Sequence, residues 1–289
     1  MIQALKDWME LFKPRVSSLV LVTALPGMIF PGKTDLLLIF VTLLGTFMMS
    51  SASFIFNQYI ERDRDARMDR TKNRPIPTGR ISPGTALFGA YLMTAAAFYI
   101  LWTHVNLLTA LAAFGSLLAY VFLYTIWLKP RTEQNIVIGG VSGCVGPLIG
   151  YAALYNNFPP ASWILFVIIF LWTPPHFWAL AIYLKDEYKN AEFPMMPVVS
   201  GVKKTTEQIF IYSILYAIST MAFYFSGETV GLLFFFPALA LSIKIIYIAW
   251  QFKQDPAPLK AKRFFLFSIT HLFAVNFLVV VDRFLNFNF

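Results

Sequence analysis

The sequence predicts an all-α polytopic membrane protein with nine transmembrane helices. Of its 289 residues, 58% are hydrophobic and only 13% are charged, and the mean hydropathy is +0.64. A typical soluble domain is about half apolar and about a quarter charged, so this composition belongs to the membrane class. The second observation is a series of apolar runs of about 20 residues, the length that crosses about 30 Å of hydrocarbon.

Short polar segments separate these apolar runs. The nine predicted spans occupy residues 16–30, 36–58, 84–103, 107–128, 136–155, 162–184, 207–225, 229–250 and 264–281. Ahead of them, apolar residues recur at helical spacing in residues 2–12, which is typical of a short amphipathic helix at the membrane surface. The first 15 residues show no cleavable signal sequence.

The basic residues predict the orientation. All Lys and Arg except Lys33, Lys244 and Arg283 fall in segments that share one side with the N-terminus. Because Lys and Arg accumulate on the cytoplasmic side, we expect a multi-pass protein of the cell membrane with a cytoplasmic N-terminus and an outside C-terminus. The net charge of +8 then belongs to one face of a protein in a lipid bilayer. Apolar spans interrupt the basic segments, which argues against a nucleic-acid partner.

Two of the inside loops, after spans two and six, are long and hold most of the carboxylates on that side. They occupy corresponding places in two successive four-helix units, with one span left over. We therefore expect a single membrane-embedded domain over 1–289, with spans 1–4 and 5–8 as pseudo-repeats whose charged loops meet over a cavity. The glycine-rich fifth span, 139-GGVSGCVGPLIG-150, indicates close helix packing, room for a ligand, or both.

The first charged loop begins with a stripe of oxygen ligands. The preceding helix is expected to continue into 57-NQYIERDRD-65, because no proline interrupts it there. At about 100° per residue, Asn57, Glu61 and Asp65 fall on one face, whereas Asp63 points to the far side. An amide and two carboxylates suit Mg²⁺, which is usually shared with substrate phosphates. A solvated loop with local salt bridges is the competing interpretation, and it accounts for most of the arginines.

Other metal and cofactor chemistry has few candidates. Cys144 is the single cysteine, and no Cys and His cluster has zinc-site spacing. His176 follows two prolines within span six, and His271 lies in span nine. A histidine in a membrane span indicates a functional site or a hydrogen bond between helices.

Residues 57–65 resemble the first aspartate-rich motif of the UbiA-type intramembrane prenyltransferases, in which Asn and spaced Asp residues bind Mg²⁺ and a prenyl diphosphate. Essentially the whole chain is similar to the branch of that family that farnesylates haem B. The similar segments are FKPRV, DRTKNRPIPTG, YTIWLKPRTEQNIVIGG and WTPPHFWALAIYLKDEYKNAEFPMMPVV. The resemblance implies transfer of a farnesyl group from farnesyl diphosphate to a vinyl group of haem B, giving haem O and diphosphate.

The resemblance also assigns residues. It implies a catalytic Mg²⁺–diphosphate site on Asn57, Glu61 and Asp65; Gln58 and Glu61 stand where the family usually has Asp. The second acidic motif is degenerate, and Asp186 is its candidate metal ligand. Fixed cations would stabilise the charge on the leaving diphosphate. The candidates are Arg64, Lys72, Arg74 and Lys129, of which Lys129 is also a catalytic candidate.

Haem iron commonly takes an imidazole, so His176 is the first haem-binding candidate, with His271 and Tyr124 as further candidates. A haem A synthase, which would act on the product, is a candidate partner. Two other functions are compatible with the sequence: a UbiA-type prenyltransferase of an aromatic quinone precursor, and a non-catalytic haem transporter or assembly factor. The stripe of metal ligands argues against a non-catalytic carrier, which does not require it.

Overall fold

The computed structural model describes residues 2–29, 35–226 and 230–285, and within these ranges all regular structure is helical. Lys33 and the predicted span ends at positions 30 and 229 lie outside the described residues. The elements are α1 (Ile2–Phe12), α2 (Pro14–Ala24), η1 (Leu25–Gly27), α3 (Leu36–Asp65), α4 (Pro83–His104), α5 (Leu107–Leu118), η2 (Ala119–Leu128), α6 (Asn135–Gly139), η3 (Gly140–Gly143), α7 (Gly146–Tyr155), α8 (Pro160–Tyr183), α9 (Lys185–Asn190), α10 (Met196–Val199), α11 (Gly201–Ala222), η4 (Phe223–Phe225), α12 (Leu232–Gln254) and α13 (Pro258–Leu285).

The predicted all-α membrane fold is confirmed, with a difference of one span. In the described ranges, eight helical segments are long and apolar enough to cross a membrane: α3, α4, α5 with η2, α6 to α7, α8, α11 with η4, α12 and α13. The exception is the first predicted span, where α2 has 11 residues and is followed by a three-residue 3-10 turn. Pro14 opens this segment and Pro26 lies in the 3-10 turn, so the regular helix is shorter than the roughly 20 residues of a full span.

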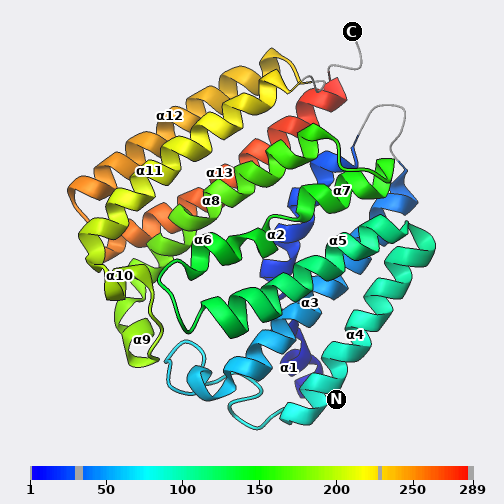
Figure 1. Ribbon diagram of the computed structural model, residues 1–289, viewed down its shortest axis with the longest axis vertical. Coiled ribbons are helices and arrows are strands. Elements are labelled where there is room, and N and C mark those ends of the chain that lie inside the picture. Colours follow the sequence, from blue (N-terminus) through cyan, green and yellow to red (C-terminus); the bar gives the residue numbers. More distant parts are fainter. Residues whose placement is uncertain (1, 30–34, 227–229, 286–289) are drawn as a thin grey trace.

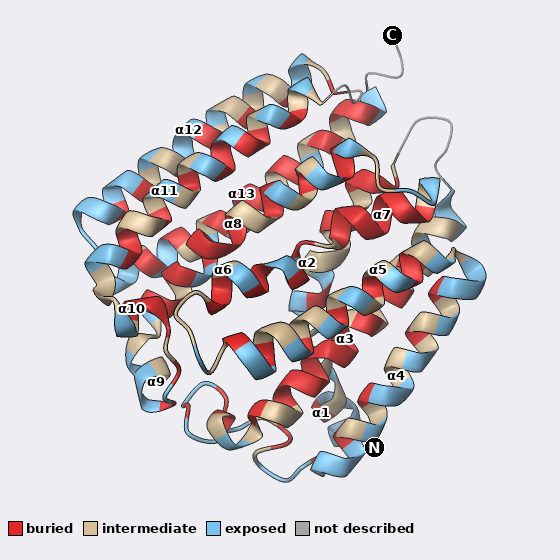
Figure 2. Cartoon of the chain, viewed as in Figure 1, coloured by how far each residue is buried: buried red, intermediate tan, exposed pale blue. Residues whose placement is uncertain are grey.

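The helices form two groups with α2, α6 and α7 between them (Figure 1). One group packs α3 against α4 and α4 against α5; the other packs α8 against α11 and α13, and α12 against both of these. Each group has its own cluster of buried apolar side chains. Buried positions concentrate on α3, α7 and α8, whereas α4 and α12 carry exposed bands at the rim (Figure 2). Exposed residues there include large apolar side chains such as Phe88 and Phe236, as expected of a lipid-facing surface.

The long helix α3 places the predicted metal stripe at one end of the bundle. The Asp35 carboxylate caps it by accepting from the backbone N–H groups of Leu37 and Leu38. Its 30 residues span about 45 Å, which exceeds the hydrocarbon thickness, so its last turns extend beyond the apolar layer. The 66–82 segment, α1, α9 and α10 lie at that same end, and the last turn of α13 lies at the other (Figure 1).

The glycine-rich fifth span is a broken helix in which both interpretations of its glycines hold. At Gly150, a Cβ atom would lie 2.1 Å from the carbonyl oxygen of Ala24, so α7 and α2 pack in backbone contact. At Gly143, in η3, a Cβ atom would meet nothing within 4 Å, and this residue lines a cavity. Gly143 is thus an open position at the break, whereas Gly139 in α6 is also close-packed, since a Cβ atom there would lie 2.3 Å from the ring of Tyr124.

The end of α13 is fixed by a buried cation. Arg283 donates to the carbonyl of Pro26 and, at 2.8 Å, to the hydroxyl of Tyr151. Its neighbour Asp282 accepts from the N–H of Gly231, at the start of α12, at 2.9 Å. These bonds join α13 to η1, α7 and α12.

The two glycines give a matched test of this packing. Gly150→Ala is expected to lower the melting temperature of the detergent-solubilised protein, because overpacking against a backbone atom costs about 1–3 kcal/mol. Gly143→Ala, the same change seven residues away, should melt like the wild type. Equal melting temperatures for Gly150→Ala and the wild type would contradict the close contact of α7 with α2.

Candidate active site

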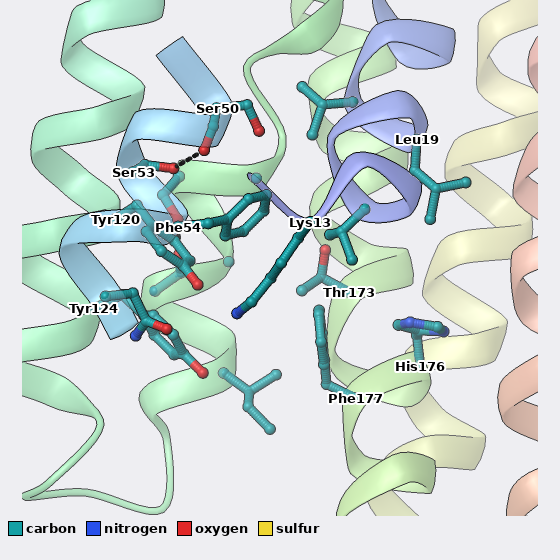
Figure 3. Close-up of a pocket in the computed structure, with 18 of the residues that line it drawn as sticks. Lys13, Leu19, Ser50, Ser53, Phe54, Tyr120, Tyr124, Thr173, His176 and Phe177 are labelled. Atoms are coloured by element: carbon teal, nitrogen blue, oxygen red, sulfur yellow. Dashed lines mark hydrogen bonds between the residues drawn. The ribbon is translucent and has the colours of Figure 1, made fainter. Parts of the chain in front are cut away.

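A cavity of about 750 Å³ lies between the two helix groups, a size typical of small-molecule sites. Its lining is mostly apolar and aromatic, and it comes from α2, α3, α5 with η2, α6 with η3, α8 and α13, with contributions from the two charged loops. Figure 3 shows part of it. The predicted site residues in the lining are Asn57, Glu61, Asp65, Arg74, Tyr124, Lys129 and His176.

The predicted stripe faces the cavity. Asn57, Glu61 and Asp65 are at most 6% exposed and all line the cavity, whereas Asp63 is exposed. The Thr125 hydroxyl donates to the carbonyl of Tyr120 and accepts from Nδ2 of Asn57 at 3.2 Å. This bond fixes the amide and leaves its oxygen as an acceptor.

Both carboxylates of the stripe form buried ion pairs. Lys129 Nζ donates to Oε2 of Glu61 at 2.6 Å, and Arg74 Nη1 donates to Oδ2 of Asp65 at 2.6 Å. Burial is the largest single effect on Lys129 and opposes its charged form, but the charge and hydrogen bond of Glu61, together with Tyr124, outweigh it, so the pKa of Lys129 is raised. A buried charge without a partner would be costly, so each ion pair offsets the burial of its two members.

The four candidate cations divide into two kinds. Arg74 and Lys129 line the cavity; Arg64 and Lys72 do not. Lys72 is exposed and pairs with Asp69 at 2.6 Å. The guanidinium of Arg64 lies 4.8 Å from the centre of the Phe193 ring.

The Phe193 ring, which Arg64 contacts, belongs to the second charged loop and lines the cavity. Lys129 Nζ lies 4.6 Å from the same ring. Phe193 thus contacts two cations of the first helix group.

The two charged loops are in contact with each other. Glu187 accepts from the backbone N–H of Arg70 at 3.3 Å, and Glu192 lies 3.7 Å from Arg67. Asp186, the predicted second metal ligand, is exposed and is not in the cavity lining. The second acidic segment therefore contacts the first loop through the neighbours of Asp186.

Lys13 is a cavity residue to which sequence reasoning assigned no role. It joins α1 to α2 with a left-handed backbone (φ 47°), which a non-glycine residue adopts only at a cost. Its side chain extends into the cavity (Figure 3), with Nζ 5.2 Å from the Phe54 ring centre. No salt bridge to Lys13 occurs in the described part of the chain. Burial, followed by the charge of Arg74, lowers the pKa of Lys13 to about 7.

Gln58 and the α1 anchors place Lys13. Gln58 is fully buried, lies outside the cavity lining, and donates to the carbonyl of Leu11 at 2.9 Å. Arg80 binds Asp7 at 2.5 Å and Glu10 at 3.2 Å, which holds α1 against the first charged loop. Gln58 therefore binds the end of α1, two residues before Lys13. In the sequence, Lys13 was marked only by its place in the FKPRV segment, which resembles the family.

The three haem candidates have different surroundings. His176 is stacked between Trp172 and Phe265, with ring centres 4.2 Å and 4.4 Å away. Tyr124 lies on η2, a π-helical stretch of the kind often found at functional sites, and faces the cavity (Figure 3). His271 is buried outside the cavity lining, where its Nδ1 lies 2.9 Å from the hydroxyl of Tyr216.

The stripe fits a magnesium ion. Oε1 of Glu61 is buried and, although close to Lys129, accepts no well-directed hydrogen bond. With the oxygen of Asn57 and the carboxylate of Asp65, this gives three oxygen ligands on one helix face. The described ranges contain no cluster of three or more His, Cys, Asp or Glu residues that could hold a metal. Mg²⁺ held here would complete its octahedral coordination with substrate and water oxygens.

Comparisons with known proteins identify the family and the fold of this chain. A curated relative in Leptospira interrogans, named protoheme IX farnesyltransferase, is 56% identical over 279 residues, which is 96% of each chain. One solved structure, concerned with digeranylgeranylglyceryl phosphate synthase in membranes, has a TM-score of 0.76 at 17% identity and covers 97% of this chain and 99% of its own. A UbiA homologue from Archaeoglobus fulgidus, bound to GPP and Mg²⁺, has a TM-score of 0.69 at 18% identity and covers 95% and 99%.

Both solved structures share the fold of this chain. The model of the UbiA prenyltransferase family matches residues 20–272, a range that contains Asn57, Glu61 and Asp65, both charged loops and His176. The chain therefore belongs to the UbiA prenyltransferase family.

Proposed function

We propose that this membrane protein transfers a farnesyl group from farnesyl diphosphate to a vinyl group of haem B, giving haem O and diphosphate. The observation that carries the proposal is a single cavity with paired buried carboxylates and cations at one end and a stacked histidine among aromatic side chains elsewhere in its lining. The name of the Leptospira interrogans relative and its 56% identity over nearly the full length support the same activity here.

The charged end would bind the diphosphate. Arg74 and Lys129 are each held 2.6 Å from a carboxylate, so they are positioned before substrate arrives. Lys13 adds a third cation, without a carboxylate partner among the described residues. Phosphate oxygens would bind these cations, Arg as a planar fork and Lys as a point charge. Arg64 and Lys72, outside the lining, would contribute through the positive field of the loop.

The oxygen ligands would hold the metal. Asn57, Glu61 and Asp65 are the proposed Mg²⁺ ligands, and the homologue that binds GPP and Mg²⁺ on the same fold supports a metal requirement. The ion would supply positive charge beside the leaving group. Asp186 would enter this site only if α9 moved toward the cavity, so we place it as a secondary ligand.

The apolar part of the cavity would protect the reaction. As the C–O bond of farnesyl diphosphate breaks, its electron pair stays with diphosphate and a carbocation forms on the farnesyl carbon. Tyr124, Phe54 and the other aromatic side chains exclude water and offer ring faces to the cation. The haem vinyl group forms the new C–C bond, and water then adds to the resulting cation and releases a proton, which leaves a hydroxyethylfarnesyl side chain.

The haem would lie against α8 and α13. His176 faces the cavity and is our candidate for the iron ligand, with Tyr124 as a second contact to the porphyrin. His271 has a hydrogen bond to Tyr216 and lies away from the cavity, so we propose a structural role for it.

The proposal also covers the domain organisation, the orientation in the membrane and a partner protein. We propose one domain over 1–289, in the cell membrane, with the charged loops and N-terminus in the cytoplasm and the C-terminus outside. Although α2 is too short for a regular span, η1 reaches the end of α13, where Arg283 binds the carbonyl of Pro26, which supports placing the two ends of the chain on opposite sides. The basic residues of those loops support this orientation through the positive-inside rule. A haem A synthase, which would take the product, is the proposed partner.

Pigment extraction tests the function. Membranes that contain this chain, given haem B, farnesyl diphosphate and Mg²⁺, should yield a more hydrophobic haem with the mass of haem O, together with free diphosphate. A prenylated quinone precursor without a new haem would favour the alternative prenyltransferase. The absence of any prenylated product would favour a haem transporter or assembly factor.

The carboxylates give a matched prediction. Asp65→Asn should lower kcat at least about 100-fold, because the metal and the leaving group lose a charged partner. Asp63→Asn, the same change on the exposed side of the helix, should turn over normally. Kinetics at saturating Mg²⁺, with melting curves as a control for folding, make the comparison. Near-normal haem O formation by Asp65→Asn would exclude the assigned metal site.

The lowered pKa of Lys13 predicts that binding of farnesyl diphosphate depends on pH. Diphosphate binds the protonated lysine, whose pKa in the free protein is about 7. Its charged fraction falls about tenfold per pH unit above that value, so KM for farnesyl diphosphate should rise between pH 7 and pH 9. Lys13→Arg, which stays charged, should flatten this rise. A KM that rises equally in both proteins would mean that Lys13 does not bind the diphosphate.

A further inference from the structure

The side chain of His176 forms a hydrogen bond with Ser268 of the opposite helix. Ser268, on α13, is 1% exposed, and its hydroxyl oxygen lies 2.7 Å from Nδ1 of His176. Its backbone carbonyl accepts from Nε1 of Trp172 at 2.8 Å. Trp172 and His176 are one turn apart on α8, so a single residue of α13 contacts both rings of this pair.

The direction of these hydrogen bonds sets the tautomer of His176. The Ser268 hydroxyl donates to the carbonyl of Phe265 at 2.7 Å, so its lone pairs are what it offers the imidazole. Nδ1 of His176 therefore meets an acceptor, and the proton resides on Nδ1.

The opposite edge of the ring is left for the cavity. Stacking against Trp172 at an interplanar angle of 18° and against Phe265 at 24° fixes the plane of the imidazole. No residue of the described ranges forms a hydrogen bond with Nε2, and His176 lines the cavity. The lone pair on Nε2 is thus fixed in direction and has no hydrogen-bond partner among the described residues.

His271 shows that this arrangement is particular to His176. Both histidines contact a hydroxyl through Nδ1. The Nε2 atom of His271, however, is buried without a partner, and this residue is not in the cavity lining. Only His176 combines a fixed ring, an acceptor at Nδ1 and access to the cavity.

We propose that Ser268 is a positioning residue that holds His176 as the Nδ1–H tautomer and thereby presents Nε2 to the cavity as the atom that binds haem iron. This inference rests on the proposed function, since it takes haem as the occupant of the cavity. A hydrogen bond from Nδ1–H to an acceptor raises the basicity of Nε2, which strengthens an iron–imidazole bond. Ser268 does not touch the haem and acts through His176.

The test uses the full-length protein in detergent, loaded with haem B in the absence of farnesyl diphosphate. Resonance Raman spectra of the ferrous complex give the iron–histidine stretching frequency, and Soret titration gives the haem Kd. Ser268→Ala should lower the stretching frequency and raise the Kd about 10- to 100-fold, the usual effect of losing the partner of a metal-bound histidine. Ser268→Thr, which keeps the hydroxyl, should restore both values.

Ser213→Ala is the matched control. Ser213 is also a fully buried helical serine whose hydroxyl donates to a backbone carbonyl, at 2.7 Å, and in the described part of the chain it forms no hydrogen bond with a histidine. The Ser213→Ala variant should leave the iron–histidine Raman band and the haem Kd unchanged. Wild-type values for Ser268→Ala, or a wild-type haem complex without an iron–histidine band, would overturn the proposal. Either result can coexist with haem O formation by the wild type, so failure of this inference is distinguishable from failure of the proposed function.

Discussion

Two carboxylates buried at the end of an apolar cavity each require a cation, and this requirement organises the site. Both acids lie on α3, but neither of their partners does: Arg74 comes from the loop that follows α3, and Lys129 follows η2. The ion pairs therefore join three segments of the first helix group. In the proposed complex with magnesium diphosphate, the two carboxylates would compensate the charge of the metal ion. The two cations would compensate the charge of the diphosphate.

The second helix group completes the cavity from the other side. Phe193 contacts Lys129, and Glu187 binds the backbone of the first charged loop, so the two loops meet above the buried charges. Below them, α8 and α13 supply a histidine fixed by stacking and by Ser268. The cavity thus combines a charged end, suited to a leaving group, with aromatic walls that suit a hydrophobic cation and a planar porphyrin.

The sequence predicted what depends on local geometry. A helical wheel places Asn57, Glu61 and Asp65 on one face because the pattern lies within two turns of one helix, and the structure shows that face turned to the cavity. The spans were also predictable, because hydrophobic length is a local property. The exception is the first span, where a proline in a 3-10 turn ends the helix early.

What depends on long-range packing could not be read from the sequence. Lys13 reaches the cavity because α1 is anchored by Arg80 and the backbone turns left-handed, and neither is visible in FKPRV. Lys72 resembled Arg74 as a candidate cation, yet it pairs with a near neighbour in solvent. His176 and His271 both lie in apolar spans, and only the packing of the helices decides which one faces the cavity.

A structure of the protein with haem, an unreactive analogue of farnesyl diphosphate, and Mn²⁺ in place of Mg²⁺ tests the central claim most directly. Anomalous scattering would locate the two metals independently. The expected result is manganese between the Glu61 and Asp65 carboxylates and the diphosphate, with iron beside Nε2 of His176 in the same cavity. Manganese at Asp186 without Glu61 and Asp65, or iron at His271 or outside the cavity, would contradict the proposed site.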